Sequence, residues 1–316
     1  MKAVYKNQTV EIIVKHHILE ELHTYINQDK RYFIITDSIV HYYYAQYFHF
    51  LKNHIFFILT PGEASKSMDS VSQIIRQMLD KEISKTDYII ALGGGVIGDL
   101  AGFVASIYKR GIRYINIPTT LIAQVDSSIG GKVGVNFDGF KNQVGSIYHP
   151  TQVFIDPECL NTLSKEQYLS GLCEVMKYAI LFDKEMFMSL FQMKKEVDYW
   201  INQSILYKID VTTADEWDEN TRQILNFGHT IGHAIEAKYG LSHGESIGYG
   251  MYFESHHPLV KSLLEKYGFD FSVSFEGLEE YIRQDKKINN QKIKKVKLID
   301  IGYAILEEGT INEFFK

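Results

Sequence analysis

The stretch Asp87–Gly111 reads DYIIALGGGVIGDLAGFVASIYKRG. Tyr88–Leu92 is an apolar run of strand length, Gly93–Gly95 interrupts it, and Val96–Tyr108 has helical character. Strand, glycine turn and helix in this order are typical of phosphate sites, where a backbone without Cβ atoms and the free N–H groups of a helix start meet an anion. A tight turn in any α/β sheet is the alternative, because the carboxylate that usually follows G-x-G-x-x-G about 20 positions later is absent.

Composition is that of a globular protein with a sizeable core. Of 316 residues, 45% are apolar and 23% are charged, which suits one large or two ordinary domains. The start has no apolar signal segment and no run reaches about 18 apolar residues, so we expect a cytoplasmic protein that does not span a membrane. The net charge of −6 disfavours a nucleic-acid surface, so an anionic ligand needs a local basic cluster. Cys159 and Cys173 are too few for a disulfide scaffold and are expected in the core.

A βαβ rhythm surrounds the glycine turn. We therefore predict an α/β, Rossmann-like nucleotide-binding domain over residues 1–156, followed by a mainly α-helical domain over 157–316. The predicted strands are Val10–Val14, Tyr32–Ile35, Ile55–Leu59, Tyr88–Leu92 and Tyr114–Ile117, and the helices between them are Ile18–Ile26, Ile74–Leu79 and Val96–Tyr108. The second half carries helical patterns at about 171–195, 197–213, 221–238 and 244–255.

Polar residues follow several predicted strands. Asp37 ends one strand, where it could bind a nucleotide ribose or equally cap the next helix. Thr119 and Thr120 end another strand and offer two hydroxyls. In the turn-rich loop that contains Glu63 and Lys66, solvated charges are the commoner outcome.

The segment Gln124–Gly145 is rich in glycine and polar side chains and has neither helical nor strand period. We expect a second active-site loop here. Lys132, Lys141 and Asn142 would supply cations and an amide to an oxygen-rich substrate.

One predicted helix, Thr221–Lys238, has function-capable side chains along one face. Arg222, Asn226, His229 and His233 fall at i, i+4, i+7 and i+11. Such a stripe is unusual for a solvated face, which favours Lys and Glu. Spacing alone pairs His229 with His233 as an i, i+4 metal clamp.

A catalytic metal needs a third protein ligand and an open position. His243 lies just beyond the helix, and Ser242 and Glu245 around it are spaced as a capping box. Glu174 is the most suggestive carboxylate because its context is apolar, and Lys177 follows three residues later on the same face.

From about Asp37 to Gly302 the sequence resembles 3-dehydroquinate synthase. The likeness rests on several long motifs, which are GGGVIGD at 93–99, PTTL at 118–121, VDSSIGGK at 125–132, EVMKY at 174–178, LNFGHTIGHA at 225–234 and HGE at 243–245. It implies a dimeric, two-domain enzyme that uses NAD and a divalent metal, usually zinc and in some cases cobalt. The implied reaction converts 3-deoxy-D-arabino-heptulosonate 7-phosphate into 3-dehydroquinate and phosphate in the shikimate pathway of aromatic amino-acid biosynthesis.

The resemblance also implies roles for individual residues. It makes Glu174, His229 and His243 the metal ligands, and it gives His233 a hydrogen bond to the substrate or its phosphate environment. Arg110 resembles the arginine that reaches the neighbouring subunit's phosphate site. The implied substrate contacts are Asp126, Lys132, Asn142, Lys177, Lys208, Arg222 and Asn226. The implied NAD contacts are Asp37, Glu63, Lys66, Gly94, Gly95, Val96, Asp99, Thr119, Thr120, Lys141 and Thr162.

The chain departs from the family pattern in two places. Asp218–Thr221 precedes the arginine where the family usually has a glycine, and Met251–Asp285 is shorter than usual. Either Lys286 or Lys287 resembles a lysine that enters the site, although a solvated basic strand is a fair competitor.

Three other functions compete with this one. They are another sugar-phosphate cyclase, a metal-dependent polyol dehydrogenase, and a non-catalytic partner that binds NAD. Arg222, Asn226 and His233 together favour the dehydroquinate reaction over another cyclase.

Overall fold

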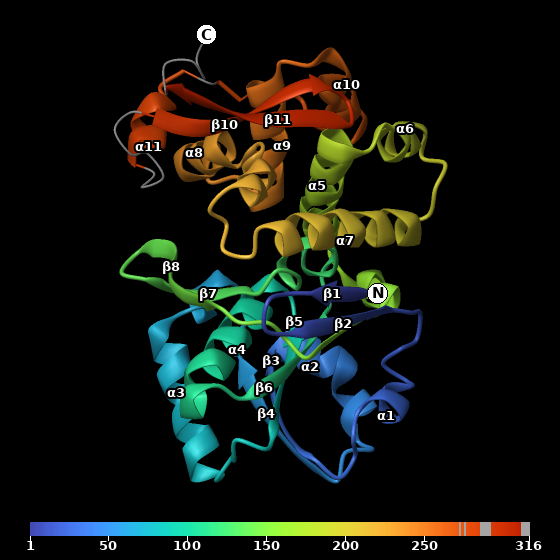
Figure 1. Cartoon of the computed structure of the whole chain (residues 1–316), viewed down its shortest axis with the longest axis vertical. Helices are drawn as coiled ribbons and strands as arrows, with labels where there is room; N and C mark the ends of the chain where they lie inside the picture. The colour runs from blue at the N-terminus through green and yellow to red at the C-terminus, as the bar shows by residue number, and fades with distance from the viewer. Residues whose placement is uncertain (272, 275, 285–291, 311–316) are drawn as a thin grey trace. The chain divides into compact units, whose positions relative to one another are not determined.

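A computed structural model describes residues 1–271, 273–274, 276–284 and 292–310 (Figure 1). It divides into two compact units, Met1–Leu163 and Ser164–Lys316. The sequence-based boundary lies after Asp156, whereas the first unit also contains the short helix η5 (Pro157–Thr162), whose Cys159 is buried in its core.

The first unit is built on a seven-stranded sheet with the strand order β1-β2-β9-β6-β5-β3-β4. All its neighbouring strands are parallel except the pair β1–β2. The strands are β1 (Lys2–Val4), β2 (Thr9–Val14), β3 (Arg31–Asp37), β4 (Asn53–Leu59), β5 (Tyr88–Gly93), β6 (Arg113–Pro118) and β9 (Gln152–Ile155). Every predicted strand lies within one of these, and the predicted α/β fold is confirmed.

Strand alternation gives the sheet two buried faces. Phe33 and Ile89 point to the face covered by helices α3 (Met68–Asp80) and α4 (Gly95–Ile107). Their neighbours Ile34 and Ile90 point to the opposite face, which α1 (Leu22–Tyr25), α2 (Ser38–Tyr44) and η1 (Ala45–Phe48) cover. Each fully buried side chain of this kind contributes roughly 1.5–3 kcal/mol. The sheet is therefore a rigid base for the residues at the strand ends.

Two predicted elements of this unit are wrong. Only Leu22–Tyr25 of the expected helix Ile18–Ile26 is α-helical, although its apolar residues are buried. The expected loop Gln124–Gly145 contains a short π-helix, η4 (Ala123–Ser127), and an antiparallel hairpin of β7 (Lys132–Phe137) and β8 (Phe140–Ile147). The hairpin turns at Asp138 and Gly139, both with positive φ, as an Asp-Gly type I′ turn requires.

The second unit is mainly helical. Its helices are α5 (Lys165–Phe182), α6 (Lys184–Gln192), α7 (Val197–Ala214), η6 (Thr221–Asn226), α8 (His229–Tyr239), α9 (His243–Ser255), α10 (Pro258–Lys266) and α11 (Glu279–Gln284). β10 (Lys292–Asp300) and β11 (Tyr303–Thr310) form an antiparallel hairpin. Across the described residues, no helix combines the length and the apolar character needed to cross a membrane.

Two predicted helices of this unit are each divided in the structure. The pattern at 171–195 covers most of α5 and α6, which meet at Asp183, the C-cap of one and the N-cap of the other. The predicted helix Thr221–Lys238 is interrupted at Phe227 and Gly228, where the backbone leaves the helical region. Arg222 and Asn226 therefore lie on η6, and they do not share a helix face with His229 and His233.

Candidate metal centre and nucleotide site

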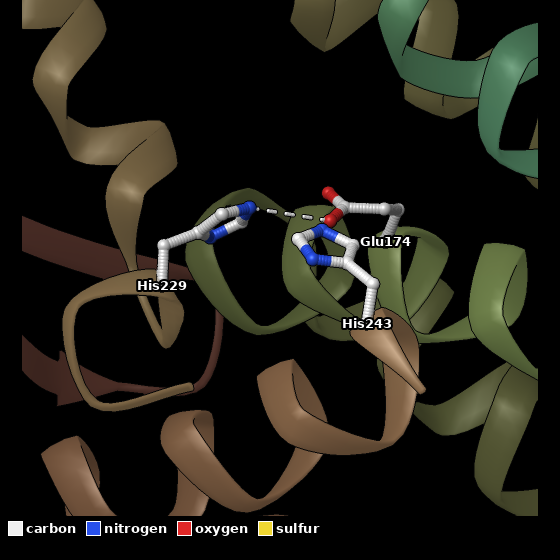
Figure 2. A group of neighbouring side chains, drawn as sticks. All are labelled: Glu174, His229 and His243. Carbon is white, nitrogen blue, oxygen red and sulfur yellow. Dashed lines mark ion pairs between the residues drawn. The ribbon is translucent and has the colours of Figure 1, made fainter. Parts of the chain in front are cut away.

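Three side chains from three helices converge within the second unit (Figure 2). Glu174 comes from α5, and His229 and His243 are the first residues of α8 and α9. One donor atom from each lies within 4.8 Å of the others. Among the described residues this is the one group of three or more His, Cys, Asp or Glu side chains with that spacing. A carboxylate and two imidazoles form a donor set that zinc and similar divalent ions accept.

Gly228 directs His229 towards this group. It has φ of 77° at the N-cap of α8, and its N–H donates to Glu254 Oε2 at 2.9 Å. There is no room for a side chain, because an added Cβ would lie 2.6 Å from Met251 Cγ and 2.9 Å from Ile247 O. Helix α9 also packs against this turn through Gly250, whose Cβ would lie 2.0 Å from Gly228 O. Close packing against α9 thus fixes the backbone at the break between η6 and α8.

The surroundings of His229 favour a neutral ring. Burial, followed by the nearby Lys177 ammonium, lowers the pKa of His229, and the Glu174 carboxylate only partly opposes this. Its Nδ1 lies 3.1 Å from Phe227 O, so Nδ1 carries the proton and Nε2 has a lone pair. That Nε2 lies 3.4 Å from Glu174 Oε1, which is also an acceptor (Figure 2). Two facing lone pairs at a site where Glu174 is only 2% exposed fit a cation between them.

His243 is oriented by both its neighbours in sequence and a carboxylate. The capping box of Ser242 and Glu245 is present, as the sequence predicted, and it starts α9 at His243. The Nδ1 of His243 lies 3.2 Å from Glu236 Oε2. A carboxylate on one ring nitrogen orients a metal-ligating histidine and leaves Nε2 for the ion.

Other predicted residues lie nearby in the second unit. The His233 ring centroid is 5.6 Å from that of His229 and 5.7 Å from that of His243. Lys177 is 1% exposed and forms an ion pair with Glu174 Oε2. Lys208 on α7 and Arg222 on η6 are also buried, and Asn226 is half-buried. Lys286 and Lys287 lie outside the described residues.

Arg222 is held in place by its own loop. Its backbone N–H donates to Asp215 Oδ2 at 3.0 Å, and its Nη1 donates to Glu216 O at 2.8 Å. Burial alone would raise the pKa of Asp215, but the N–H groups of Arg222, Asn220 and Glu219 outweigh it and lower the pKa. An ionised Asp215 therefore closes the loop that contains Asp218–Thr221, the segment that departs from the family pattern.

In the first unit, the glycine turn lies between β5 and α4. Gly94 caps α4, and an added Cβ would lie 2.9 Å from Thr120 Cγ2, while one at Gly95 would lie 3.1 Å from Ser127 Oγ. None of Gly93, Gly94 and Gly95 has a positive φ. Glycine is thus needed at positions 94 and 95 because a Cβ atom would be crowded there, and not because the backbone requires a positive φ. Val96 follows in the first turn, where the N–H groups of a helix have no intrahelical partner.

A polar network joins the Glu63–Ser65 turn, α4 and the hairpin. The buried Lys66 Nζ donates to Asp99 Oδ2 at 2.6 Å and also to Asn142 Oδ1. Asn136 Nδ2 donates to Glu63 Oε1 at 2.7 Å. Asp37 Oδ1 caps α2 by accepting from Ile39 N and Val40 N, so the capping interpretation of Asp37 is present in the structure.

The remaining predicted residues of this unit come from several loops and strand ends. Thr119 N donates to Gly93 O at 3.0 Å, and Thr162 Oγ1 lies 2.6 Å from the Tyr44 hydroxyl. Asp126 is on η4, and Lys132 starts β7. Lys141 and Arg110 are exposed, and Arg110 has φ of 61°.

Three residues in contact with these groups were missed from the sequence: Asn136, Glu236 and Glu254. Only Asn136 had a usable signal, since the Asp138-Gly139 pair between apolar alternations predicts a hairpin beside it. The two glutamates look like ordinary solvated helix residues until α8 and α9 are packed together.

Comparison with known sequences gives one family for both halves of the chain. The profile described as 3-dehydroquinate synthase N-terminal matches residues 56–170, and the profile described as 3-dehydroquinate synthase C-terminal matches 171–288. The 3-dehydroquinate synthase of Clostridium botulinum is 40% identical over 98% of this chain and 98% of its own length. That of Dictyoglomus thermophilum is 39% identical over 98% of this chain and 94% of its own.

Solved structures with the same fold hold both kinds of cofactor. A 2-deoxy-scyllo-inosose synthase complexed with carbaglucose-6-phosphate, NAD⁺ and Co²⁺ is 25% identical, with a TM-score of 0.86 over 100% of this chain and 97% of that one. A 2-epi-5-epi-valiolone synthase from Streptomyces hygroscopicus, with NAD⁺ and Zn²⁺ bound, is 24% identical, with a TM-score of 0.86 over 99% of this chain and 96% of that one.

Proposed function

This chain belongs to the 3-dehydroquinate synthase family, and we propose which of its residues bind the metal, the nucleotide and the substrate. The enzyme converts 3-deoxy-D-arabino-heptulosonate 7-phosphate into 3-dehydroquinate and phosphate, and it depends on NAD and a divalent metal. We assign the metal to Glu174, His229 and His243. The observation that carries this assignment is the convergence of a buried carboxylate and two imidazole nitrogens within 4.8 Å.

Each cofactor supplies one kind of chemistry when bound: the metal polarises substrate oxygens, and NAD takes up a hydride and later returns it. The second unit provides the ligands for the metal. Its Lys177, Lys208 and Arg222 are at most 7% exposed, and they bring cations to a substrate that carries a phosphate and a carboxylate. Asn226 and His233 are proposed to hydrogen-bond the same substrate. These buried cations meet the need for a local basic cluster in a chain with net charge −6.

We assign nucleotide binding to the first unit. Gly94, Gly95 and Val96 bring the start of α4 close to the pyrophosphate, where free N–H groups stabilise its charge. Lys66, held by Asp99, adds a fixed cation beside them. The other proposed nucleotide contacts are Asp37, Glu63, Thr119, Thr120, Lys141 and Thr162, and the proposed substrate contacts of this unit are Asp126, Lys132 and Asn142.

Sequence identity to the known relatives distinguishes between the competing cyclase reactions. The two 3-dehydroquinate synthases named above are 39–40% identical over 98% of this chain, whereas the inosose synthase is 25% identical. The dehydroquinate reaction is therefore supported over other carbocycle-forming reactions. The assay supplies the heptulosonate phosphate with zinc and a catalytic amount of NAD, and follows phosphate release and the enone formed by dehydration of the product.

Each rival function has its own result in that assay. NADH that accumulates in step with consumption of a simple alcohol would support the polyol dehydrogenase. Bound NAD without phosphate release would support the non-catalytic partner. We further propose a cytoplasmic homodimer, in which Arg110 reaches the other subunit's phosphate site. Light scattering measures the dimer, and a monomer with full turnover would contradict it.

A further inference from the structure

Asn136 is a half-buried amide between two groups of proposed ligand contacts, and neither the sequence nor the family resemblance gives it a role. It lies on β7, opposite an irregularity in the hairpin. Val135 pairs with Val144 and Phe137 pairs with Phe140, so the single residue Asn136 faces residues 141–143 of β8. A bulge of this kind redirects side chains and leaves ladder groups without their usual partners.

The Asn136 side chain fills the gap that this bulge creates. Its Oδ1 accepts from the backbone N–H of Asn142 at 2.9 Å. Asn142 itself has φ of 55°, a left-handed conformation that needs a fixed partner to persist. That bond sets the direction of Asn142, whose Oδ1 then accepts from Lys66.

The same amide also reaches the Glu63–Ser65 turn. Its Nδ2 donates to Glu63 Oε1 at 2.7 Å, and its backbone N–H donates to Lys66 O at 2.9 Å. A parallel bridge between Ser67 and Asn136 continues the contact. One residue thus connects the turn that carries Glu63 and Lys66 with the strand that carries Lys141 and Asn142.

We propose that Asn136 is a positioning residue that holds Glu63 ready for the nucleotide and Asn142 ready for the substrate. In this role it acts through Glu63 and Asn142 and not by touching a ligand itself. This inference rests on the proposed function, because that proposal supplies the roles of Glu63 and Asn142. The two hydrogen bonds of its side chain have opposite polarity, so substitutions can remove them separately.

Asn136→Asp is the main test. The carboxylate still accepts from Asn142 N–H, but it cannot donate to Glu63, and it faces another carboxylate. We expect NAD affinity, measured by calorimetry, to fall roughly tenfold. The KM for the heptulosonate phosphate should change less than about twofold, because Asn142 keeps its bond. Asn136→Ala loses both bonds and should weaken both NAD and substrate binding.

Testing Asn136→Asp in a second variant, Glu63→Gln, separates a positioning role from a general loss of structure. In Glu63→Gln, the new amide can donate to an Asp at position 136, so Asn136→Asp should cost less than about threefold in NAD affinity there. A merely structural loss would be equal in both backgrounds. Gln73→Glu is the matched control, since it makes the same change from an amide to a carboxylate at an exposed residue of α3 that has no proposed ligand role. It should leave NAD affinity unchanged.

Glu63→Ala distinguishes failure of this inference from failure of the proposed function. If Glu63→Ala leaves NAD affinity unchanged, the nucleotide role of this turn is wrong and the inference falls with it. If Glu63→Ala weakens NAD binding but Asn136→Asp behaves like Gln73→Glu, only the positioning role is overturned. An equal loss for Asn136→Asp in both backgrounds also overturns it.

Discussion

The rings of His233 and His243 lie at almost the same distance from that of His229, 5.6 Å and 5.7 Å, yet His233 belongs to α8 and His243 to α9. The Nδ1 of His243 lies 3.2 Å from Glu236 Oε2, which leaves Nε2 for an ion. We predict that His243→Ala and Glu174→Ala weaken zinc binding more than about a hundredfold, because each removes a direct ligand. His233→Ala should keep the metal and lose activity, since we assign it to the substrate. Bound zinc is measured in the purified variants.

The alternative outcome for these histidines is equally specific. A metal-free His233→Ala beside a zinc-loaded His243→Ala would restore the i, i+4 clamp that spacing alone suggests. Glu236→Gln serves as the graded control, because it keeps a hydrogen-bond acceptor for the ring but removes the charge. It should reduce zinc affinity by about tenfold and leave some metal bound.

Lys132 is an exposed residue at the start of β7, and we assign it to the substrate. We predict that Lys132→Ala reduces turnover by more than about a hundredfold while NAD affinity changes less than threefold, because it removes a cation from the substrate alone. Steady-state kinetics and calorimetry measure the two quantities. Equal losses in both would place Lys132 at the nucleotide. Lys141→Ala is the contrasting variant, and NAD affinity should be its larger loss.

At the scale of elements, the turn before α8 decides where His229 lies. Gly228 and Gly240 both have left-handed backbone, with φ of 77° and 66°, and they border the same helix. We predict that Gly240→Ala costs about 1–2 kcal/mol, which is the strain of the backbone alone, because nothing lies within 4 Å of the added Cβ. Gly228→Ala should cost about 3 kcal/mol or more, since its Cβ also meets Met251 and the backbone of Ile247.

Urea unfolding followed by circular dichroism measures both variants. Zinc binding adds a second measure, because Gly228→Ala displaces the first residue of α8 and Gly240→Ala leaves it in place. Equal destabilisation of the two variants would show that α9 does not constrain the turn. Loss of zinc in Gly240→Ala alone would contradict the account of how His229 is placed.

Elements of this protein differ in how well sequence predicts them. The central strands β3, β5 and β6 are short apolar runs buried on both faces, so local composition is enough to predict them. The break at Phe227–Gly228 was missed because the polar stripe of 222–233 has helical spacing, and only packing against Gly250 shows that the chain cannot continue as one helix. The capping box at Ser242 was predictable, since both its partners are local.

The candidate sites follow the same rule. The residues of the metal centre could be named from motifs, but their convergence depends on how α5 packs with α8 and α9, which lie far from it in sequence. The contribution of Asn136 could not be predicted, because it arises from a bulge whose register depends on how β7 and β8 pair. Long-range contacts therefore decide the supporting residues, whereas the proposed direct contacts come from the motifs that carry the family resemblance.

At the scale of the whole molecule, the two cofactors are assigned to separate compact units. All three proposed metal ligands lie in Ser164–Lys316, and the turn at Gly94 lies in Met1–Leu163. A ligand that binds only the folded state stabilises it, by about 2.7 kcal/mol at a hundred times its Kd. We predict that zinc slows amide exchange in α5, α8 and α9, and that NAD slows it at the start of α4 and in the β7–β8 hairpin.

Hydrogen exchange with each cofactor alone and with both measures this directly. The Glu174→Ala variant is the matched control for zinc, because it should lose the protection of the second unit and keep the protection that NAD gives to the first. Protection by zinc in both units, abolished by Glu174→Ala, would mean that residues outside Ser164–Lys316 also hold the ion. Protection confined to the second unit requires that α5, α8 and α9 alone fix the metal, as their converging side chains indicate.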